Sequence, residues 1–486
     1  MNLKSQLKNH NLLQTGILIN GDWLTGNRLT FNVTNPANDK IIAQVSQATQ
    51  DDLTLAVESS TVAQKYWSQQ TTKERSKILR KWYELIIQNQ DDLAIILTAE
   101  QGKPLTEARN EILYGASYIE WYSEETKRIN GYTIPANNPN QRIQVNLEPI
   151  GVCAAITPWN FPNAMLARKV APALAAGCSI IAKPASLTPL STNALAVIAL
   201  EAGIPAGLFN VIHGHSGQIG EFLCSQQNIR KLSFTGSTEV GIWLYQNCAN
   251  SMKKLSLELG GNAPLLVFPT ANLDDAVIGT MNSKFRNSGQ TCVCSNRILV
   301  HSSLKSELIT KLLIQISMLK LGSGFDPNVT NGPLIDDNAL IHIKSLVADA
   351  ISKGALLHCG GNVSTQLKGR FFEPTLIECL DHNVRLFNEE IFGPVLAIYT
   401  FEDEQEAIQL ANKTQYGLAS YLFSQDVAQI HRVSEQLQAG IVGVNTGLIS
   451  AENVPFGGVK MSGLGREGGQ SGIKEYLVEK YICLSL

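Results

Sequence analysis

Short apolar runs alternate with amphipathic runs between about residue 150 and residue 270. The short runs fit buried strands and the longer runs fit helices, so the alternation predicts βαβ units around a parallel sheet. The expected strands cover residues 150–156, 179–183, 210–213, 231–234 and 255–259, and the expected helices cover 163–176, 190–201 and 238–250. A doubly wound α/β domain follows from this order.

A second series of the same kind begins after Gly260 and Gly261. Its expected strands cover 265–268 and 297–301, and its expected helices cover 274–287 and 305–320. We therefore predict two doubly wound, Rossmann-like α/β domains. Helical periodicity dominates residues 51–128, which we expect to form a helical layer over the first domain.

One segment fits neither domain. Residues 133–141 are polar and contain two prolines, and residues 142–147 then alternate between polar and apolar. This pattern predicts an exposed hairpin, which cannot bury both of its faces alone.

Composition excludes several classes of protein. A chain of 486 residues with 44% hydrophobic residues is long enough for two or more packed cores. The 42 acidic and 39 basic residues give a net charge of -3, which argues against a nucleic-acid-binding protein. No apolar run approaches the roughly 18 residues of a membrane span. The first ten residues carry neither an apolar signal core nor an arginine-rich presequence, so we expect a cytoplasmic protein.

The nine cysteines are scattered, which favours reduced core thiols over a disulfide framework. Cys292 differs from the others because it follows a helical run in a turn of small residues, where a thiol can be presented as a nucleophile. The alternative is a small buried hydrophobic residue. Glu258 lies in an apolar strand pattern that ends in two glycines, and a buried carboxylate there needs a function or a partner.

Three segments carry a resemblance to a known family. They are residues 284–294 (KFRNSGQTCVC), 257–262 (LELGGN) and 157–162 (TPWNFP). Together they resemble the catalytic signatures of the aldehyde dehydrogenase superfamily, and similar motifs extend in family order from residue 19 to residue 467. The resemblance implies a cofactor-binding domain of residues 1–128 and 148–259, a catalytic domain of residues 260–460, and an oligomerisation arm of residues 129–147 and 461–486.

The resemblance also assigns the catalytic residues. Cys292 is expected to attack an aldehyde and to form first a thiohemiacetal and then a thioester. Glu258 is expected to activate the water that hydrolyses the thioester. Asn160 is expected to donate a hydrogen bond to the oxyanion. Each of these residues, met alone, has a plainer structural interpretation, and the surrounding motifs favour the catalytic one.

The sequence lacks the Gly-x-Gly-x-x-Gly pattern of many dinucleotide sites. Residues 234–241 instead join a strand to a helix whose N-terminus can face a phosphate. The resemblance implies that the cofactor is bound by the following residues: Thr157, Pro158, Trp159, Lys183, Ser186, Gly236, Ser237, Glu389 and Phe392. NAD-specific relatives commonly carry glutamate where this chain has Ser186, and Lys183 offers a cation, so we predict a preference for NADP, with NAD as the alternative.

Four residues indicate the substrate. Arg168, Arg286 and Ser450, with Phe456 as an aromatic wall, resemble the carboxylate-binding residues of succinate-semialdehyde dehydrogenases. Either arginine alone is equally compatible with a surface charge. Thr446 departs from the glutamate common in close relatives, and glutarate semialdehyde, one carbon longer, stays open as a substrate.

The remaining features concern redox chemistry, metals and assembly. Cys294 stands two residues from Cys292, as in redox-regulated relatives, and either traps an oxidised Cys292 as a disulfide or only packs. No metal is expected, because the Cys-x-Cys pair lacks further ligands at a recognisable spacing. The resemblance implies a homo-oligomer, a dimer or tetramer. A silent binding protein or a thiol redox protein explains the intact catalytic set poorly.

Overall fold

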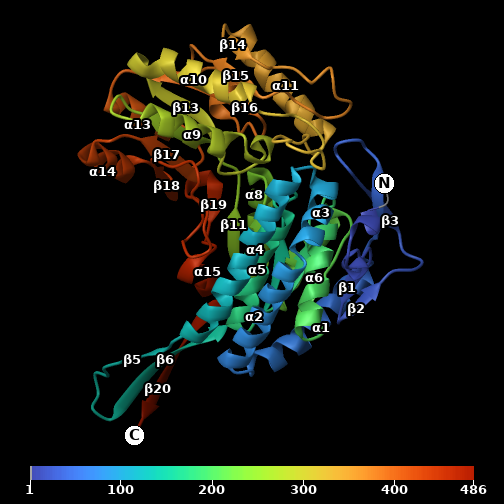
Figure 1. The fold of residues 1–486 in the computed structure, drawn as a ribbon. Coiled ribbons are helices and arrows are strands. Elements are labelled where there is room, and N and C mark those ends of the chain that lie inside the picture. The colour runs from blue at the N-terminus through green and yellow to red at the C-terminus, as the bar shows by residue number, and fades with distance from the viewer. Residues whose placement is uncertain (1–2) are drawn as a thin grey trace.

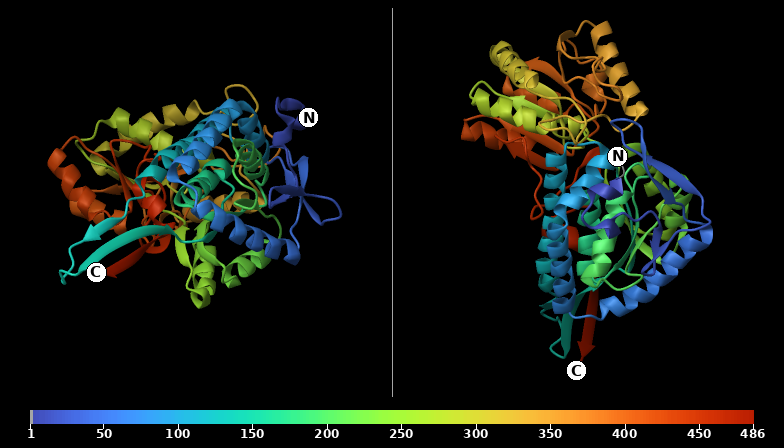
Figure 2. Two further views of the ribbon diagram at one scale, coloured as in Figure 1. Left: turned by 90° about the horizontal axis from the view of Figure 1, so that it is seen from below. Right: turned by 45° about the vertical axis from the view of Figure 1, so that its right-hand side comes forward.

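The computed structural model describes residues 3–486 and contains two sheet-centred lobes and a projecting β-arm (Figure 1). The two lobes lie one above the other in Figure 1, and the arm extends from the lower one. Two turned views in Figure 2 show the same arm standing away from the helices. The predicted fold class, two doubly wound domains with a β-arm, is confirmed.

The lower lobe contains an eight-stranded sheet in the order β19-β11-β10-β7-β8-β9-β1-β2. Its five central strands run parallel: β7 (Val152–Ile156), β8 (Ser179–Lys183), β9 (Phe209–Val211), β10 (Ile229–Thr235) and β11 (Lys254–Glu258). The edges are antiparallel: β1 (Ile17–Ile19), β2 (Asp22–Leu24) and β19 (Gly463–Leu464). Because ligands of such sheets bind beyond the carboxyl ends of the parallel strands, the ends of β7, β10 and β11 are the places to examine.

Helices cover both faces of this sheet. They are α1 (Gln50–Ser68), α2 (Thr72–Gln88), α3 (Gln90–Gln101), α4 (Leu105–Glu125), α5 (Pro162–Ala176), α6 (Leu190–Ala202), α7 (Ser216–Ser225) and α8 (Thr238–Cys248). Capping boxes, Thr49 with Asp52 and Thr71 with Glu74, define the starts of α1 and α2. Every residue of α5 is buried, since α4 packs over it from the predicted helical layer.

The upper lobe contains a seven-stranded sheet in the order β14-β15-β16-β13-β12-β17-β18. Its strands are β12 (Ala263–Val267), β13 (Ser295–His301), β14 (Leu356–Cys359), β15 (Thr375–Glu378), β16 (Val395–Phe401), β17 (Ala419–Phe423) and β18 (Ile441–Val444). Its helices are α9 (Leu273–Lys284), α10 (Lys305–Ser317), α11 (Asp337–Ser352), α12 (Arg385–Asn388), α13 (Glu404–Asn412) and α14 (Val427–Gln436). Only the β14–β15 pair is antiparallel.

The arm consists of β5 (Tyr132–Ile134), β6 (Gln141–Pro149) and β20 (Leu477–Ser485). The sequence predicted an arm segment that begins at residue 461, and the structure differs. Strand β19 pairs with β11 of the first sheet, and α15 (Gly469–Lys474) packs on α4 and α5. Residues 463–474 therefore complete the lower lobe, where the side chains of Glu467 and Ile473 are buried.

The helix predicted for residues 274–287 also ends earlier, at Lys284. A short 3-10 turn, Arg286–Gly289, follows, and within it Asn287 and Ser288 adopt φ angles of 50° and 54°. Left-handed backbone at two successive non-glycine residues breaks the helix and redirects the chain. Within residues 3–486, no helix combines the length and the apolar character needed to cross a lipid bilayer.

Candidate active site

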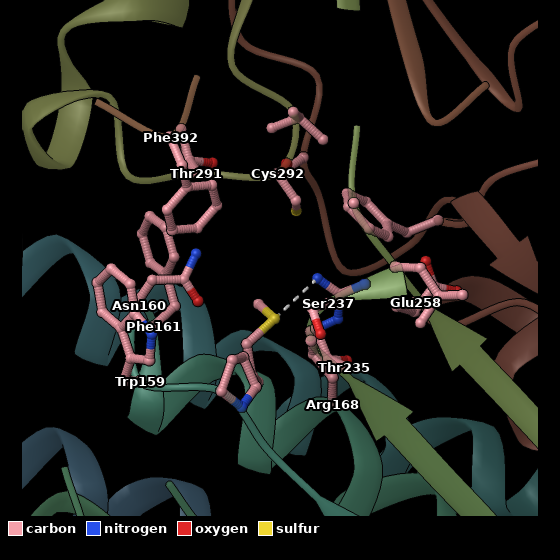
Figure 3. A pocket seen from close by; sticks show the side chains of 18 of the residues that line it. Trp159, Asn160, Phe161, Arg168, Thr235, Ser237, Glu258, Thr291, Cys292 and Phe392 are labelled. Atoms are coloured by element: carbon pink, nitrogen blue, oxygen red, sulfur yellow. Dashed lines mark hydrogen bonds between the residues drawn. The ribbon is translucent and has the colours of Figure 1, made fainter. Parts of the chain in front are cut away.

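A cavity of about 280 Å³ lies where the two lobes meet. It brings together Asn160 from the loop after β7, Glu258 from the end of β11, and Cys292 from the turn before β13. Figure 3 shows these side chains around one common space. Three residues from separate parts of the chain, with Asn160 and Cys292 more than 100 positions apart, thus meet at the point that the sheet topology predicts for a ligand.

The backbone around Cys292 is held on several sides. The N–H of Cys294 donates to the carbonyl of Thr291 at 3.1 Å, and the Tyr421 hydroxyl donates to the carbonyl of Val293 at 2.7 Å. A side chain at Gly261 would put its Cβ 2.3 Å from the Cys292 carbonyl oxygen, so only glycine allows this close approach. Contacts within the protein therefore hold the nucleophile loop in this conformation without a substrate.

The environment of the Cys292 thiol keeps it protonated. Burial, with the nearby carboxylates of Glu390 and Glu258, raises the pKa of this thiol to about 12, against the opposing effect of Arg168 and Arg286. A thiol is a much weaker nucleophile than a thiolate. Attack by Cys292 therefore requires a base that removes its proton.

Glu258 has the properties of such a base. Its side chain is 3% exposed, and neither carboxylate oxygen has a hydrogen-bond partner. Burial and the neighbouring Glu467 carboxylate raise the pKa of Glu258 well above its usual range. An unpartnered carboxylate with a raised pKa is able to take a proton from a thiol or from water at neutral to alkaline pH.

Asn160 faces the nucleophile loop. Its side-chain amide donates to the carbonyl of Gln290 at 3.0 Å, which places the amide beside the chain that leads into Cys292. The second amide hydrogen is left for a group inside the cavity. This geometry fits a donor for an oxyanion formed at Cys292.

Two arginines line the same cavity. The Arg168 guanidinium lies 4.0 Å above the Phe456 ring, its Nε forms an ion pair with Glu467 at 2.8 Å, and its Nη1 donates to the Met165 sulfur (dashed line in Figure 3). Its Nη2 is buried without a partner, as is the Nε of Arg286. Ser450 also lines the cavity. Unpartnered guanidinium nitrogens in a cavity are suited to hold an anion.

The comparisons with known proteins agree with this geometry. A model described as "Aldehyde dehydrogenase family" matches residues 23–482. The chain belongs to the aldehyde dehydrogenase family. It is 50% identical to "Succinate-semialdehyde dehydrogenase [NADP(+)] GabD" of Escherichia coli (strain K12), over 99% of this chain and 100% of that protein.

Two further relatives of this aldehyde dehydrogenase are equally similar. A "Glutarate-semialdehyde dehydrogenase" of Pseudomonas putida is 50% identical over 99% of this chain and 100% of its own length. The crystal structure of an E. coli NADP-dependent enzyme, also 50% identical, has a TM-score of 0.98 and covers 99% of this chain and 100% of that one.

Most of the predicted cofactor residues lie together. Pro158, Trp159, Gly236, Ser237 and Phe392 line the cavity. Ser237 is exposed and caps α8 by accepting the N–H of Val240, so the helix N-terminus faces the opening. The buried Thr157 hydroxyl has no hydrogen-bond partner. An orphaned hydroxyl and an open helix N-terminus fit the hydroxyl and phosphate groups of a nicotinamide nucleotide.

The residues expected to select the cofactor follow β8. Lys183 ends this strand, and its Nζ donates to Ser216 Oγ at 2.7 Å and to the carbonyl of Pro184 at 3.2 Å. Burial lowers the pKa of Lys183 to about 8. Ser186 lies three residues further on and is half-buried. The turn carries no carboxylate that would repel a 2′-phosphate.

The structure does not bring Glu389 to the cavity. Both carboxylate oxygens of Glu389 are held by Arg385, at 2.6 and 2.9 Å. Its neighbour Glu390 lines the cavity instead, accepts the N–H of Gly261 at 3.0 Å, and has its pKa raised to about 7 by burial. Successive side chains on extended backbone point in opposite directions, so only one of two adjacent glutamates can face the cavity.

The sequence interpretation missed several buried charges beside the cavity. The Lys169 ammonium contacts Glu467 and donates to the Thr235 hydroxyl at 2.6 Å. The available signal was the presence of Arg168 and Lys169 in the otherwise apolar sequence of α5, since fully buried cations need partners. Glu467 is that shared partner.

Cys294 lies away from the cavity surface. Its buried thiol donates to the carbonyl of Lys284 at 3.6 Å, and burial raises its pKa. Disulfide exchange between Cys292 and Cys294 stays a prediction. Across residues 3–486, no cluster of three or more His, Cys, Asp or Glu side chains is arranged to hold a metal ion.

Proposed function

We propose that this aldehyde dehydrogenase oxidises succinic semialdehyde to succinate and reduces NADP. The observation that carries the proposal is the pair of buried, unpartnered guanidinium nitrogens of Arg168 and Arg286 in the cavity of Cys292. A short aldehyde with a carboxylate at its other end satisfies both groups at once. The similarity to the E. coli succinate-semialdehyde dehydrogenase supports this choice.

The chemistry follows from the positions of the three catalytic residues. Glu258 takes the thiol proton, directly or through water, and the Cys292 sulfur adds to the aldehyde carbon. The Asn160 amide and the Cys292 N–H hold the resulting oxyanion. NADP, which Trp159, Ser237 and Phe392 would hold in the cavity, would supply the acceptor for the hydride that leaves this adduct. Once Glu258 has lost the thiol proton to solvent, it takes a proton from the water that attacks the thioester and returns this proton to the leaving sulfur, which releases the acid and the free thiol.

The substrate assignment predicts the effect of Arg286→Ala. Loss of a guanidinium partner to a carboxylate removes about 1.5–3 kcal/mol, so KM for succinic semialdehyde should rise by about 10- to 100-fold. KM for butanal, which has the same chain length but no carboxylate, should stay within about twofold. Steady-state assays of reduced nicotinamide with both aldehydes measure the two values. Equal KM changes for both aldehydes, or none for succinic semialdehyde, would contradict the proposal.

Glutarate semialdehyde is the second candidate substrate. The Pseudomonas putida glutarate-semialdehyde dehydrogenase is as similar to this chain as the E. coli succinate-semialdehyde dehydrogenase is, at 50% identity, which favours glutarate semialdehyde as an alternative. It presents the same two end groups with one more methylene, which in a fitted pocket changes binding by about 1–3 kcal/mol. The ratio of kcat/KM for the two semialdehydes, measured in the same assay, decides between them.

The cofactor assignment predicts the effect of Ser186→Glu. A carboxylate after β8 would accept a hydrogen bond from a 2′-hydroxyl and repel a 2′-phosphate. The ratio of kcat/KM for NADP to that for NAD should fall by at least about tenfold, as expected for one charge-assisted contact. Ser186→Gln is the control, because glutamine has the size of glutamate without its charge. It should change the ratio much less. A wild-type enzyme that already prefers NAD would contradict the assignment.

We also propose that the enzyme is a homo-oligomer assembled through the arm. The arm exposes apolar side chains that its own strands leave uncovered: Tyr132, Ile134, Val478, Tyr481, Ile482 and Leu484. Tyr132, Ile134 and Tyr481 lie on one face of the arm, and Val478, Ile482 and Leu484 lie on the other. Exposed apolar side chains on a projecting sheet favour contact with another protein surface.

A further inference from the structure

Lys103, in the short connection between α3 and α4, contacts the loop that carries Asn160. Its side chain is almost fully buried, and its Nζ donates to the main-chain carbonyl of Asn160 at 2.8 Å and to Glu111 at 2.5 Å. The same Nζ lies 3.9 Å from the centre of the Phe161 ring. A single ammonium group thus contacts two successive residues of this loop and one acidic partner.

Glu111 extends this contact to the helix that follows the loop. Its second carboxylate oxygen accepts the N–H groups of Asn163 and Ala164, at 3.0 and 3.3 Å, in the first turn of α5. Negative charge at a helix N-terminus is favourable, and the two N–H groups have no partner within the helix. The Lys103–Glu111 pair therefore fixes both ends of the segment from Asn160 to Ala164.

Asn287 connects the same carbonyl to the nucleophile loop. Its side-chain amide donates to the carbonyl of Asn160 at 3.0 Å and to that of Gln290 at 3.3 Å, while its oxygen accepts from Gln101 at 3.0 Å. Gln290 is also the acceptor of the Asn160 side chain. Lys103 and Asn287 share one acceptor, the Asn160 carbonyl, so the loop of Asn160 and the loop of Cys292 are held in one hydrogen-bonded network.

We propose that Lys103 is a positioning residue for aldehyde oxidation, which with Glu111 holds Asn160 where its amide meets the oxyanion formed at Cys292. An apolar side chain would fill this space without the cost of removing a charge from water. A buried lysine is tolerated only where its ammonium group is paired and hydrogen-bonded. All three contacts of its ammonium group fix the loop of Asn160 and the helix behind it. The inference rests on the proposed roles of Cys292 and Asn160.

The test uses the double variant Lys103→Met/Glu111→Gln. Removing both charges avoids leaving a buried carboxylate without its partner, and glutamine keeps an oxygen for the α5 N–H groups. Misplacement of a catalytic group lowers turnover steeply, so kcat should fall by at least about tenfold. KM for the aldehyde and Kd for NADP should change much less than kcat, because Lys103 makes no direct contact with the substrate arginines or with α8 and shares only the Phe161 ring with Arg286.

A second reaction separates this inference from the choice of substrate. Hydrolysis of an activated aryl ester needs the Cys292 nucleophile and the oxyanion donor, but neither the cofactor nor a substrate carboxylate. Its kcat should fall in the double variant by the same factor as that of aldehyde oxidation. If the wild type oxidises another aldehyde better than succinic semialdehyde, the proposed function fails while the ester assay still tests Lys103.

Lys231→Met is the matched control. Lys231 is also fully buried, but its ammonium contacts Ser256, Glu475 and the Tyr476 ring, away from the loop of Asn160. Its kcat in both assays should stay within about threefold of wild type once the folded fraction is matched. An equal loss in Lys231→Met would mean that the effect of Lys103 is only structural.

A third variant keeps the test decisive if the double variant does not fold. Asn287→Gly removes the neighbouring donor to the Asn160 carbonyl, and glycine accepts the left-handed backbone at this position. It should also lower kcat in both assays by at least about fivefold, with KM nearly unchanged. Folded variants at Lys103 and Asn287 that retain the wild-type kcat in both assays would overturn the proposal.

Discussion

Cys292→Ser is expected to reduce aldehyde oxidation by at least about 10⁴-fold, as is typical when a catalytic nucleophile is lost. The hydroxyl of serine is a far weaker acid than a thiol, and the cavity already raises the pKa of the Cys292 thiol to about 12. Glu258 cannot deprotonate a hydroxyl in the same place. The measurement is steady-state turnover of succinic semialdehyde with NADP.

Binding of the cofactor separates loss of chemistry from loss of structure. Kd for NADP, measured by calorimetry, should stay within about twofold of the wild-type value in Cys292→Ser. The exchanged atom is not part of the α8 N-terminus, where the cofactor phosphate is expected to bind. Cys359→Ser is the matched control, since Cys359 is half-buried like Cys292 but lies on β14, away from the cavity. Persistent turnover in Cys292→Ser, or an equal loss in Cys359→Ser, would contradict the assignment.

Glu258→Gln is expected to slow hydrolysis of the thioester by about 10²- to 10⁴-fold, the usual contribution of a positioned general base. Glutamine has a similar shape but cannot accept the proton of the attacking water. At alkaline pH, where hydroxide can remove the Cys292 proton in place of Glu258, the first turnover should still form reduced cofactor, since hydride transfer precedes hydrolysis. Stopped-flow absorbance should therefore show a burst followed by a very slow steady state.

The pH dependence of the wild type follows from the same residue. Burial and Glu467 raise the pKa of Glu258, so the carboxylate form that acts as a base is gained as pH rises through a value above the usual carboxyl range. Steady-state turnover should accordingly increase as pH rises above the usual carboxyl range, and Glu258→Gln should lose this dependence in the hydrolysis step. Glu389→Gln, a carboxylate held by Arg385 outside the cavity, should behave as the wild type.

Much of the fold was predictable because apolar and polar residues alternate regularly along its helices and strands. The strand predicted for residues 179–183 matches β8, and the helix predicted for residues 190–201 differs from α6 by one residue. Strand β8 is a short, mostly apolar run in a parallel sheet, and α6 is a longer, mostly apolar run that packs on a face of that sheet. The catalytic residues were predictable for another reason, namely that three short motifs surround them without gaps.

The structure differs from the sequence-based prediction at features that leave no regular pattern of apolar and polar residues. The helix that leads to Cys292 ends early because Asn287 adopts a left-handed backbone conformation. The sequence does not predict this conformation, because the residue is not a glycine. Glu389 and Glu390 are chemically identical, and only the direction of the chain decides which one faces the cavity. Lys103 and Glu111 carry no motif, since their role depends on contacts with residues about 50 positions away.

The most direct test is peptide mass spectrometry of the Glu258→Gln enzyme, mixed with succinic semialdehyde and NADP at alkaline pH, where hydroxide can deprotonate the Cys292 thiol, and then quenched in acid. A succinyl thioester is expected on the peptide that contains Cys292, formed in step with the burst of reduced cofactor and absent when NADP is omitted. A burst without this adduct, or an adduct on another residue, would contradict the central claim that Cys292 carries the substrate through oxidation.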